Sequence, residues 1–129
     1  MGIGCYGEGV DGRAENVTEA QKRYPNIPFY IANVEDSSIA HLGKFDLVLC
    51  FGLLYHLENP FAAMRNLYAL TTKVLLIESM TVPEQRPVLI LRDEGQSEDQ
   101  GLHFIAFIRR KAQSSRCATG AVSLLSIAS

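Results

Sequence analysis

The sequence predicts an α/β fold, a mostly parallel, doubly wound sheet with helices on both faces. Four short apolar segments recur at intervals of roughly twenty residues. Three of them are continuously apolar rather than alternating, which is typical of strands covered on both faces. Helical patterns lie between the segments. Strand–helix–strand repeats favour parallel pairing through right-handed crossovers.

The first two strands are expected at residues 7–11 and 29–32, where short apolar runs occur. The helix between them ends before Pro25, because proline lacks the N–H that a continuing helix needs. Its apolar positions, at helical spacing, are Val17, Ala20 and Tyr24.

The next two strands are expected at residues 47–51 and 74–78, joined by a longer helix. Asn59 is suited to cap that helix, and Pro60 to occupy its first position. Before the third strand, residues 35–44 allow only a short helix. The longer helix carries one apolar stripe, which consists of Phe61, Met64, Leu67 and Tyr68.

The pattern loosens beyond the fourth strand. Apolar runs at 87–92 and 103–108 predict two further strands, separated by a polar loop at 93–101. The sequence then becomes rich in Ser, Ala and Arg and loses its periodicity. We therefore expect one α/β domain over residues 1–108 and an atypical basic tail over residues 109–129.

The charge distribution is uneven although the net charge is only −2, which implies no general attraction to nucleic acid or membrane. All fourteen acidic residues lie at or before Asp99. The tail is locally basic and could contact phosphate, but solvated cations are the commoner case in a Ser/Ala-rich segment. Its apolar end, residues 121–128, is expected to form a weak turn or helix. The cations of the tail are Arg109, Arg110, Lys111 and Arg116.

The cysteines and the apolar runs predict a cytoplasmic protein. Cys5, Cys50 and Cys117 are odd in number and lack CxxC spacing, so neither a disulfide framework nor a zinc site is expected. No apolar run reaches the roughly 18 residues of a membrane helix, and the start lacks a secretory signal.

Polar residues follow the expected strands, at the edge where a parallel sheet binds ligands. These positions are Asp11, residues 33–36, residues 50–52 and Glu78. A carboxylate accepts strong hydrogen bonds from both vicinal hydroxyls of a ribose, and Asp11 suits that role. An equally good interpretation makes Asp11 a turn residue that leads into the first helix.

Four segments of the chain resemble class I S-adenosylmethionine-dependent methyltransferases, in consistent order over roughly residues 4–80. They are GVDGRAENV, ANVED, FDLVLCFGLLYHLENP and VLLIES; the third is fairly specific, and the others are individually weak. The resemblance implies a Rossmann-like, three-layer α/β/α sheet, S-adenosyl-L-methionine as cofactor, and methyl transfer. Because the cofactor carries the reactivity, the absence of a catalytic triad does not argue against this activity.

The same resemblance implies five cofactor-binding residues. Asp11 would bind the ribose, while Asn33 and Val34 would line the adenine pocket. The family usually has Asp at the position of Asn33, but an amide oxygen can also accept from the adenine amino group. Cys50 and Phe51 would place backbone groups near the methionine portion.

Two further residues, Tyr55 and His56, would lie close to the methyl-transfer cleft and contact the acceptor. His56 is a candidate general base, since its ordinary pKa lies near neutrality. A structural histidine in the turn after the strand is the commoner case. No catalytic residue is therefore assigned, and none of the histidines has metal-ligand spacing.

The beginning of the chain departs from the family, which opens with a strand, a Gly-rich loop and a long helix. Here Gly2, Gly4 and Gly7 spell GxGxxG, but Asp11 follows Gly7 by only four residues. A dinucleotide-binding unit needs a crossover helix in that interval, so a nicotinamide dehydrogenase ranks last. We expect an incomplete sheet that lacks the first strand, most of the Gly-rich loop and its helix.

The first hypothesis is therefore S-adenosylmethionine-dependent methyl transfer to a small-molecule acceptor, impaired by the missing elements. A second hypothesis changes the acceptor to RNA, because LLYHLENP also resembles methyltransferase-fold enzymes that modify transfer RNA wobble uridines. The third is non-catalytic: a truncated binding module or homo-oligomer in which a partner covers the exposed sheet.

Overall fold

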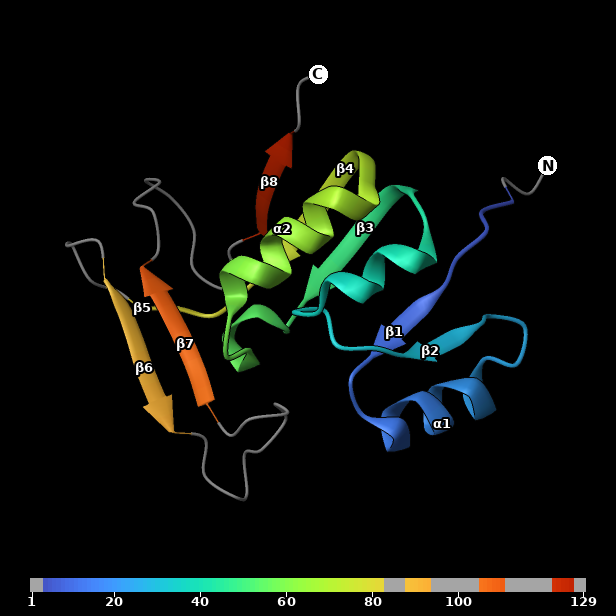
Figure 1. Ribbon diagram of the computed structural model, residues 1–129, viewed down its shortest axis with the longest axis horizontal. Coiled ribbons are helices and arrows are strands. Elements are labelled where there is room, and N and C mark those ends of the chain that lie inside the picture. The colour runs from blue at the N-terminus through green and yellow to red at the C-terminus, as the bar shows by residue number, and fades with distance from the viewer. Residues whose placement is uncertain (1–3, 83–87, 94–104, 111–121, 127–129) are drawn as a thin grey trace.

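The computed structural model describes residues 4–82, 88–93, 105–110 and 122–126 (Figure 1). The strands are β1 (Gly9–Asp11), β2 (Phe29–Ile31), β3 (Phe45–Phe51), β4 (Thr71–Glu78), β5 (Thr81–Val82), β6 (Leu89–Asp93), β7 (Ile105–Arg110) and β8 (Val122–Ser126). The helices are α1 (Ala14–Arg23), α2 (Pro60–Leu70) and the short 3₁₀ helices η1 (Ser37–Leu42) and η2 (Leu54–His56).

The first unit of the fold is β1, α1 and β2, as the sequence predicts. β1 and β2 pair in parallel, with Val10 opposite Tyr30 and Asp11 opposite Ile31. The helix α1 ends at Arg23, two residues before Pro25. A Cβ atom on Gly9 would meet the ring of Phe29 at 2.2 Å, so this glycine leaves space for the Phe29 ring on the neighbouring strand.

The second unit is β3, α2 and β4, and it is also parallel, with Cys50 opposite Ile77 and Phe51 opposite Glu78. The side chain of Asn59 accepts the Ala62 N–H at 3.0 Å, which caps α2. The prediction of Asn59 and Pro60 at the start of this helix is confirmed.

A third set of strands, β5, β7 and β6, follows the second unit. β6 and β7 pair in antiparallel fashion, and the sequence predicts both strands. β5 has two residues and pairs in parallel with β7. The predicted polar loop at 93–101 lies, beyond Asp93, outside the described residues.

The end of the chain corrects one expectation. Residues 121–128 were expected to form a weak turn or helix, but β8 is a strand that pairs antiparallel with β4 along five residue pairs. The prediction was wrong because a segment of five residues shows no reliable period, and the partner strand decides its conformation.

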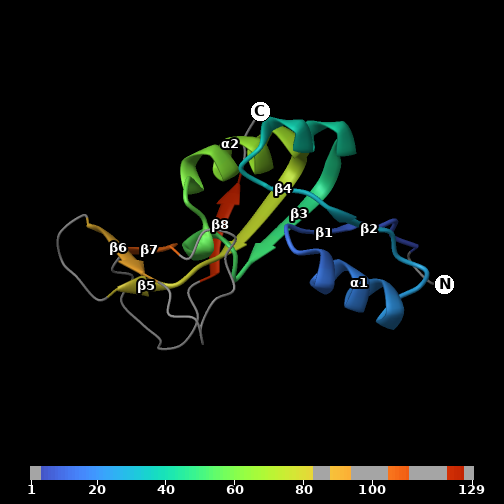
Figure 2. The same ribbon diagram turned by 60° about the horizontal axis from the view of Figure 1, so that its bottom comes forward.

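The predicted sheet is divided in the described part of the chain. β1 pairs with β2, and β3 pairs with β4, but β1 and β3 belong to different sheets. In Figure 1 the two pairs lie beside each other, with β1 on the side of β3. Figure 2 shows α1 on one side of the strands and α2 with η1 on the other. The fold is therefore a Rossmann-like α/β/α arrangement whose sheet is small and incomplete.

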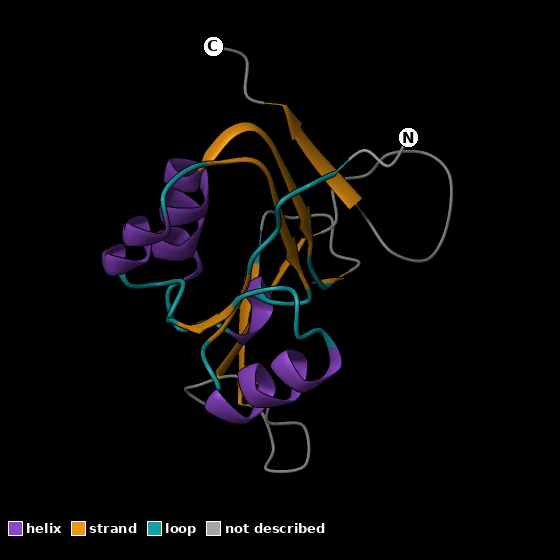
Figure 3. Cartoon of the chain, turned by 90° about the vertical axis from the view of Figure 1, so that its right-hand side faces the viewer, coloured by secondary structure: helices purple, strands orange, loops and turns teal. Residues whose placement is uncertain are grey.

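The hydrophobic core lies between the β3–β4 pair and the helices α2 and η1, which Figure 3 shows gathered on one side of these strands. The opposite face of β3 is open: Leu47, Leu49 and Phe51 are each more than half exposed. The sequence suggests strands covered on both faces, and for β3 the described residues cover only one. The core residues are Val34, Ile39, Cys50, Leu54, Leu57, Ala63, Leu67, Leu70, Leu75 and Ile77.

Candidate functional site

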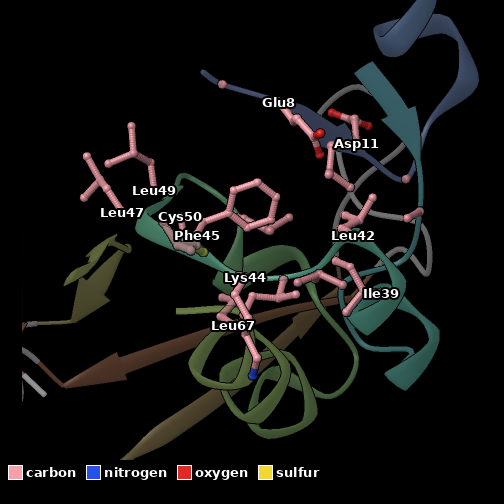
Figure 4. Close-up of a pocket in the computed structure, with 18 of the residues that line it drawn as sticks. Glu8, Asp11, Ile39, Leu42, Lys44, Phe45, Leu47, Leu49, Cys50 and Leu67 are labelled. Atoms are coloured by element: carbon pink, nitrogen blue, oxygen red, sulfur yellow. The ribbon is translucent and has the colours of Figure 1, made fainter. Parts of the chain in front are cut away.

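A cavity of about 990 Å³ opens between β1 and β3, at the division of the sheet (Figure 4). Its polar end holds the carboxylates of Glu8 and Asp11, and its apolar end lies along Leu47 and Leu49 of β3. It collects residues that follow three different strands, as expected for the ligand edge of a parallel sheet. Five of the predicted site residues line it: Asp11, Asn33, Val34, Cys50 and His56.

Asp11 ends β1, and both of its carboxylate oxygens accept hydrogen bonds. Its Oδ1 accepts the Arg13 backbone N–H at 2.8 Å, and its Oδ2 accepts from Asn16 Nδ2 at 3.1 Å. These contacts make Asp11 the residue that turns the chain into α1. An ionised carboxylate has about four acceptor positions. The turn contacts therefore leave capacity for a ligand, and the ribose role stays a prediction.

Asn33 and Val34 follow β2 in a tightly held turn. Asn33 Oδ1 accepts the Glu35 N–H at 2.9 Å, and the Asn33 carbonyl accepts the Asp36 N–H at 3.1 Å. Asn66 of α2 donates its Nδ2 hydrogen to the Val34 carbonyl at 2.8 Å. Because Val34 is also buried, this segment of the cavity wall has one fixed conformation.

The turn after β2 is also tied to the start of α2. The backbone N–H of Asn59 donates to Glu35 Oε1, while the side chain of Asn59 caps the helix. The sequence places Glu35 at the ligand edge without assigning it a role, and it does not identify Asn66. The signal was present in ANVED and NPFAAMRN, but spacing alone does not show that the two segments touch.

Cys50 and Phe51 lie on opposite faces of β3, as alternation along a strand requires. The Cys50 thiol is buried, and burial, together with the negative charge of Glu78, raises its pKa to about 11. A buried thiol with a raised pKa is unreactive at neutral pH. Phe51 is 54% exposed and is not among the cavity-lining residues, so its predicted role concerns only the backbone.

The turn after β3 explains why this apolar strand ends at a glycine. Gly52 has φ +65°, a conformation that glycine adopts without strain. Its N–H donates to Glu78 Oε2 at 2.9 Å and also approaches the Glu78 carbonyl at 3.3 Å. Glu78 thus fixes the direction in which the chain leaves β3. The sequence places this acid at the end of a strand but does not reveal its partner.

Tyr55 and His56 lie in η2, directly after this turn. Their ring centroids are 4.2 Å apart with an angle of 50° between the planes. His56 lines the cavity, whereas Tyr55 does not. The structure thus brings only one of the two predicted acceptor residues to the cavity wall, and their roles stay predictions.

Within the described ranges, no three His, Cys, Asp or Glu side chains converge as a metal site would require. No helix in these ranges is long and apolar enough to cross a membrane. The cavity instead offers carboxylate acceptors at one end, an amide beside them and an apolar wall. Such a cavity suits a small ligand with hydroxyl groups and a flat apolar part.

Comparison with known proteins agrees with this geometry. A family model described as a methyltransferase domain matches residues 3–73, more than half of the chain. A tRNA U34 carboxymethyltransferase of Campylobacter jejuni is 26% identical over 84 residues, and the match covers 64% of this chain and 28% of that protein. A protein with the same name from Campylobacter lari is 27% identical over 67 residues. The chain therefore spans less than a third of the length of these curated relatives.

One solved structure with a similar fold is the N-terminal domain of EvdMO1 with SAH bound. It is 24% identical, the TM-score is 0.66, and the match covers 81% of this chain and 49% of that one. A second structure of the same domain, obtained in the presence of SAH and D-fucose, gives a TM-score of 0.67. At this identity the likeness establishes the fold.

Proposed function

This chain belongs to the methyltransferase domain family, and from that premise we propose that its cavity binds S-adenosyl-L-methionine for methyl transfer to a small-molecule acceptor. The observation that carries the proposal is that one cavity collects the ends of β1, β2 and β3. The cofactor supplies an activated methyl group. The protein supplies binding and alignment of the reacting atoms.

We assign the nucleoside part of the cofactor to the polar part of the wall. Asp11 offers its remaining acceptor positions to the ribose hydroxyls, beside the turn contacts it already makes. Asn33 and Val34, held by Asn66, form the surface for the base. The fit of the donor set to a nucleoside supports the assignment.

We assign the methionine portion and the acceptor to the end of β3 and the segment that follows it. Backbone groups at Cys50 and Phe51 would lie near the methionine portion, and Tyr55 with His56 near the acceptor. Gly52, fixed by Glu78, sets where these residues lie relative to the cavity. Proton removal from a hydroxyl acceptor would be the role of His56.

The test is calorimetric titration of the protein with S-adenosylhomocysteine. Asp11→Ala removes a charged acceptor and is expected to weaken binding by about ten- to a hundredfold. Asp11→Asn keeps an acceptor for the Arg13 N–H, so it separates the ribose role from the turn role. Its loss of affinity should be close to that of Asp11→Ala, while its unfolding midpoint stays close to that of the parent.

The control is Glu19→Ala, which removes an exposed carboxylate on α1 whose ion pair within the described residues is with Arg23. This change should leave affinity unaltered. Lack of binding by the parent protein would contradict the proposed function. Equal affinity of the parent and both Asp11 variants would restrict Asp11 to the turn.

A second candidate acceptor is RNA, and the names of the Campylobacter relatives favour it. The name of those proteins gives tRNA as the acceptor and carboxymethyl as the transferred group. Binding of tRNA to this chain should then weaken steeply as salt is raised, because phosphate contacts release counterions. Retention on immobilised tRNA that does not respond to salt, or no retention, would count against this candidate.

A further inference from the structure

We propose that Asn33 recognises the nucleobase as a hydrogen-bond donor, through its amide NH₂ group, so that the site tolerates 6-oxopurine as well as adenine nucleosides. This inference rests on the proposed function, because it specifies how the base is read in the same cavity. It concerns a residue that lines the cavity at the end of β2.

The orientation of the Asn33 amide is fixed by its neighbour. The atom that meets the Glu35 backbone N–H at 2.9 Å must be an acceptor, since an N–H cannot bond to another donor. It is therefore the amide oxygen, Oδ1. The NH₂ group lies on the other branch of the same planar amide, and it makes no hydrogen bond to the described part of the chain.

The backbone that carries Asn33 cannot easily turn to reverse this arrangement. Its carbonyl accepts the Asp36 N–H, and the next carbonyl, that of Val34, accepts from Asn66 of α2. Glu35, whose N–H holds the amide oxygen, is itself tied to Asn59. A flipped amide would place NH₂ against N–H and lose the bond to Glu35.

Donor and acceptor at this position select different bases. A carboxylate only accepts, so it favours the 6-amino group of adenine and disfavours a 6-oxo group. The Asn33 oxygen is held by the Glu35 N–H and keeps one lone pair, whereas the NH₂ group has both of its hydrogens for the ligand, so we take NH₂ as the group that reads the base. This group can donate to a ring nitrogen of adenine or to the oxygen of a 6-oxopurine such as hypoxanthine.

Asn33→Asp changes this chemistry with almost no change in shape. One carboxylate oxygen continues to accept the Glu35 N–H, and the other takes the position of the NH₂ group. The turn is therefore preserved while a donor becomes an acceptor. Gln21→Glu is the matched control, because it makes the same amide-to-acid change at an exposed position of α1 that does not line the cavity.

The experiment compares the affinities of S-adenosylhomocysteine and S-inosylhomocysteine by calorimetry, for the parent, Asn33→Asp and Gln21→Glu. The parent should prefer the adenosyl compound by less than about tenfold. Asn33→Asp should raise that preference by about tenfold or more, the size expected for a hydrogen bond to a charged group. Gln21→Glu should match the parent.

Three other outcomes would overturn the inference, and only the last of them also overturns the proposed function. If S-adenosylhomocysteine binds but Asn33→Asp leaves the preference unchanged, the inference fails and the proposed function stands. The inference also fails, and the proposed function stands, if the parent binds S-inosylhomocysteine a hundredfold or more weakly than S-adenosylhomocysteine. If neither compound binds the parent, the proposed function fails together with the inference.

Discussion

Cys50 of β3 lies both in the hydrophobic core and at the border of the cavity. Its thiol is 3% exposed and packs in the core, yet the residue also borders the cavity. Burial removes water that would stabilise a thiolate, and the Glu78 carboxylate adds repulsion. The thiol therefore stays protonated in the folded protein well above neutral pH.

This raised pKa predicts a loss of stability at high pH. The pKa of Cys50 is about 11 in the folded protein, against 9.0 for the unperturbed thiol, so the unfolded chain loses its proton first as pH rises. The stability that the protonated thiol contributes is fully present below about pH 9 and is lost by about pH 11. The free energy of unfolding should therefore fall by about 2–3 kcal/mol between these pH values. Urea unfolding between pH 8 and pH 11 measures it.

Cys50→Val is the control for this titration, because it keeps the volume and removes the ionisable group. The free energy of unfolding of the parent should fall more steeply than that of Cys50→Val over this range. Parallel curves for the two proteins would show that Cys50 does not titrate as described.

Asp11 illustrates how far single residues can be read from sequence. Its position after an apolar strand left a turn role and a ribose role equally open. The structure establishes the turn contacts with Arg13 and Asn16, and these do not use the whole acceptor capacity of the carboxylate. Glu35, Asn66 and Glu78 act on the cavity through contacts over more than twenty positions in the chain, which no local pattern encodes.

At the scale of elements, the position of the Phe29 ring of β2 over β1 depends on Gly9. A Cβ atom at this position would come within 2.2 Å of the Phe29 ring. Gly9→Ala should therefore destabilise the protein by about 1–3 kcal/mol, the usual cost of overpacking. Gly7→Ala is the matched control, since no atom lies within 4 Å of the corresponding Cβ.

The comparison is made by urea unfolding of the two variants and the parent. Gly7→Ala should have little effect, because Gly7 has no positive φ value and has open space around it. Equal destabilisation by both substitutions would mean that the glycines matter for a reason other than the contact with Phe29.

Elements with a strong local signal were predictable, and those decided by their partners were not. The helix α2 has a cap and a proline at its first position, as predicted. The predicted apolar stripe was partly wrong, because Phe61 and Tyr68 are exposed, whereas the helix buries Ala63, Leu67 and Leu70. The strands β3 and β4 are continuous apolar runs. In contrast, β5 has two residues, and β8 lies in a Ser-rich segment; both are strands only because β7 and β4 pair with them.

For the whole molecule, the sequence predicted an incomplete parallel sheet but not its division in the described residues into β1–β2 and β3–β4. Sequence periodicity predicts strands, whereas the pairing of strands distant in the chain depends on what fills the space between them. The division produces the cavity and leaves an apolar face of β3 exposed. Its members are Leu47, Leu49 and Phe51.

This exposed face predicts self-association, because contiguous apolar surface is the usual mark of an interaction site. The parent should show a mass above the 14.2 kDa of one chain in light scattering, increasing with concentration. Leu49→Lys should restore the monomer. Phe61→Lys, at a 67% exposed position on α2, serves as the control and should leave the mass unchanged. A monomeric parent at all concentrations would contradict the homo-oligomer.

We propose that the carboxyl ends of β1 and β3 form one nucleoside site. The most direct measurement is a titration of the ¹⁵N-labelled protein with S-adenosylhomocysteine, followed through backbone amide resonances. We expect the amides of Gly12 and Arg13, after β1, and those of Phe51 and Gly52, at the end of β3, to shift together with one dissociation constant. Shifts confined to one of the two segments, or absent from both, would contradict it.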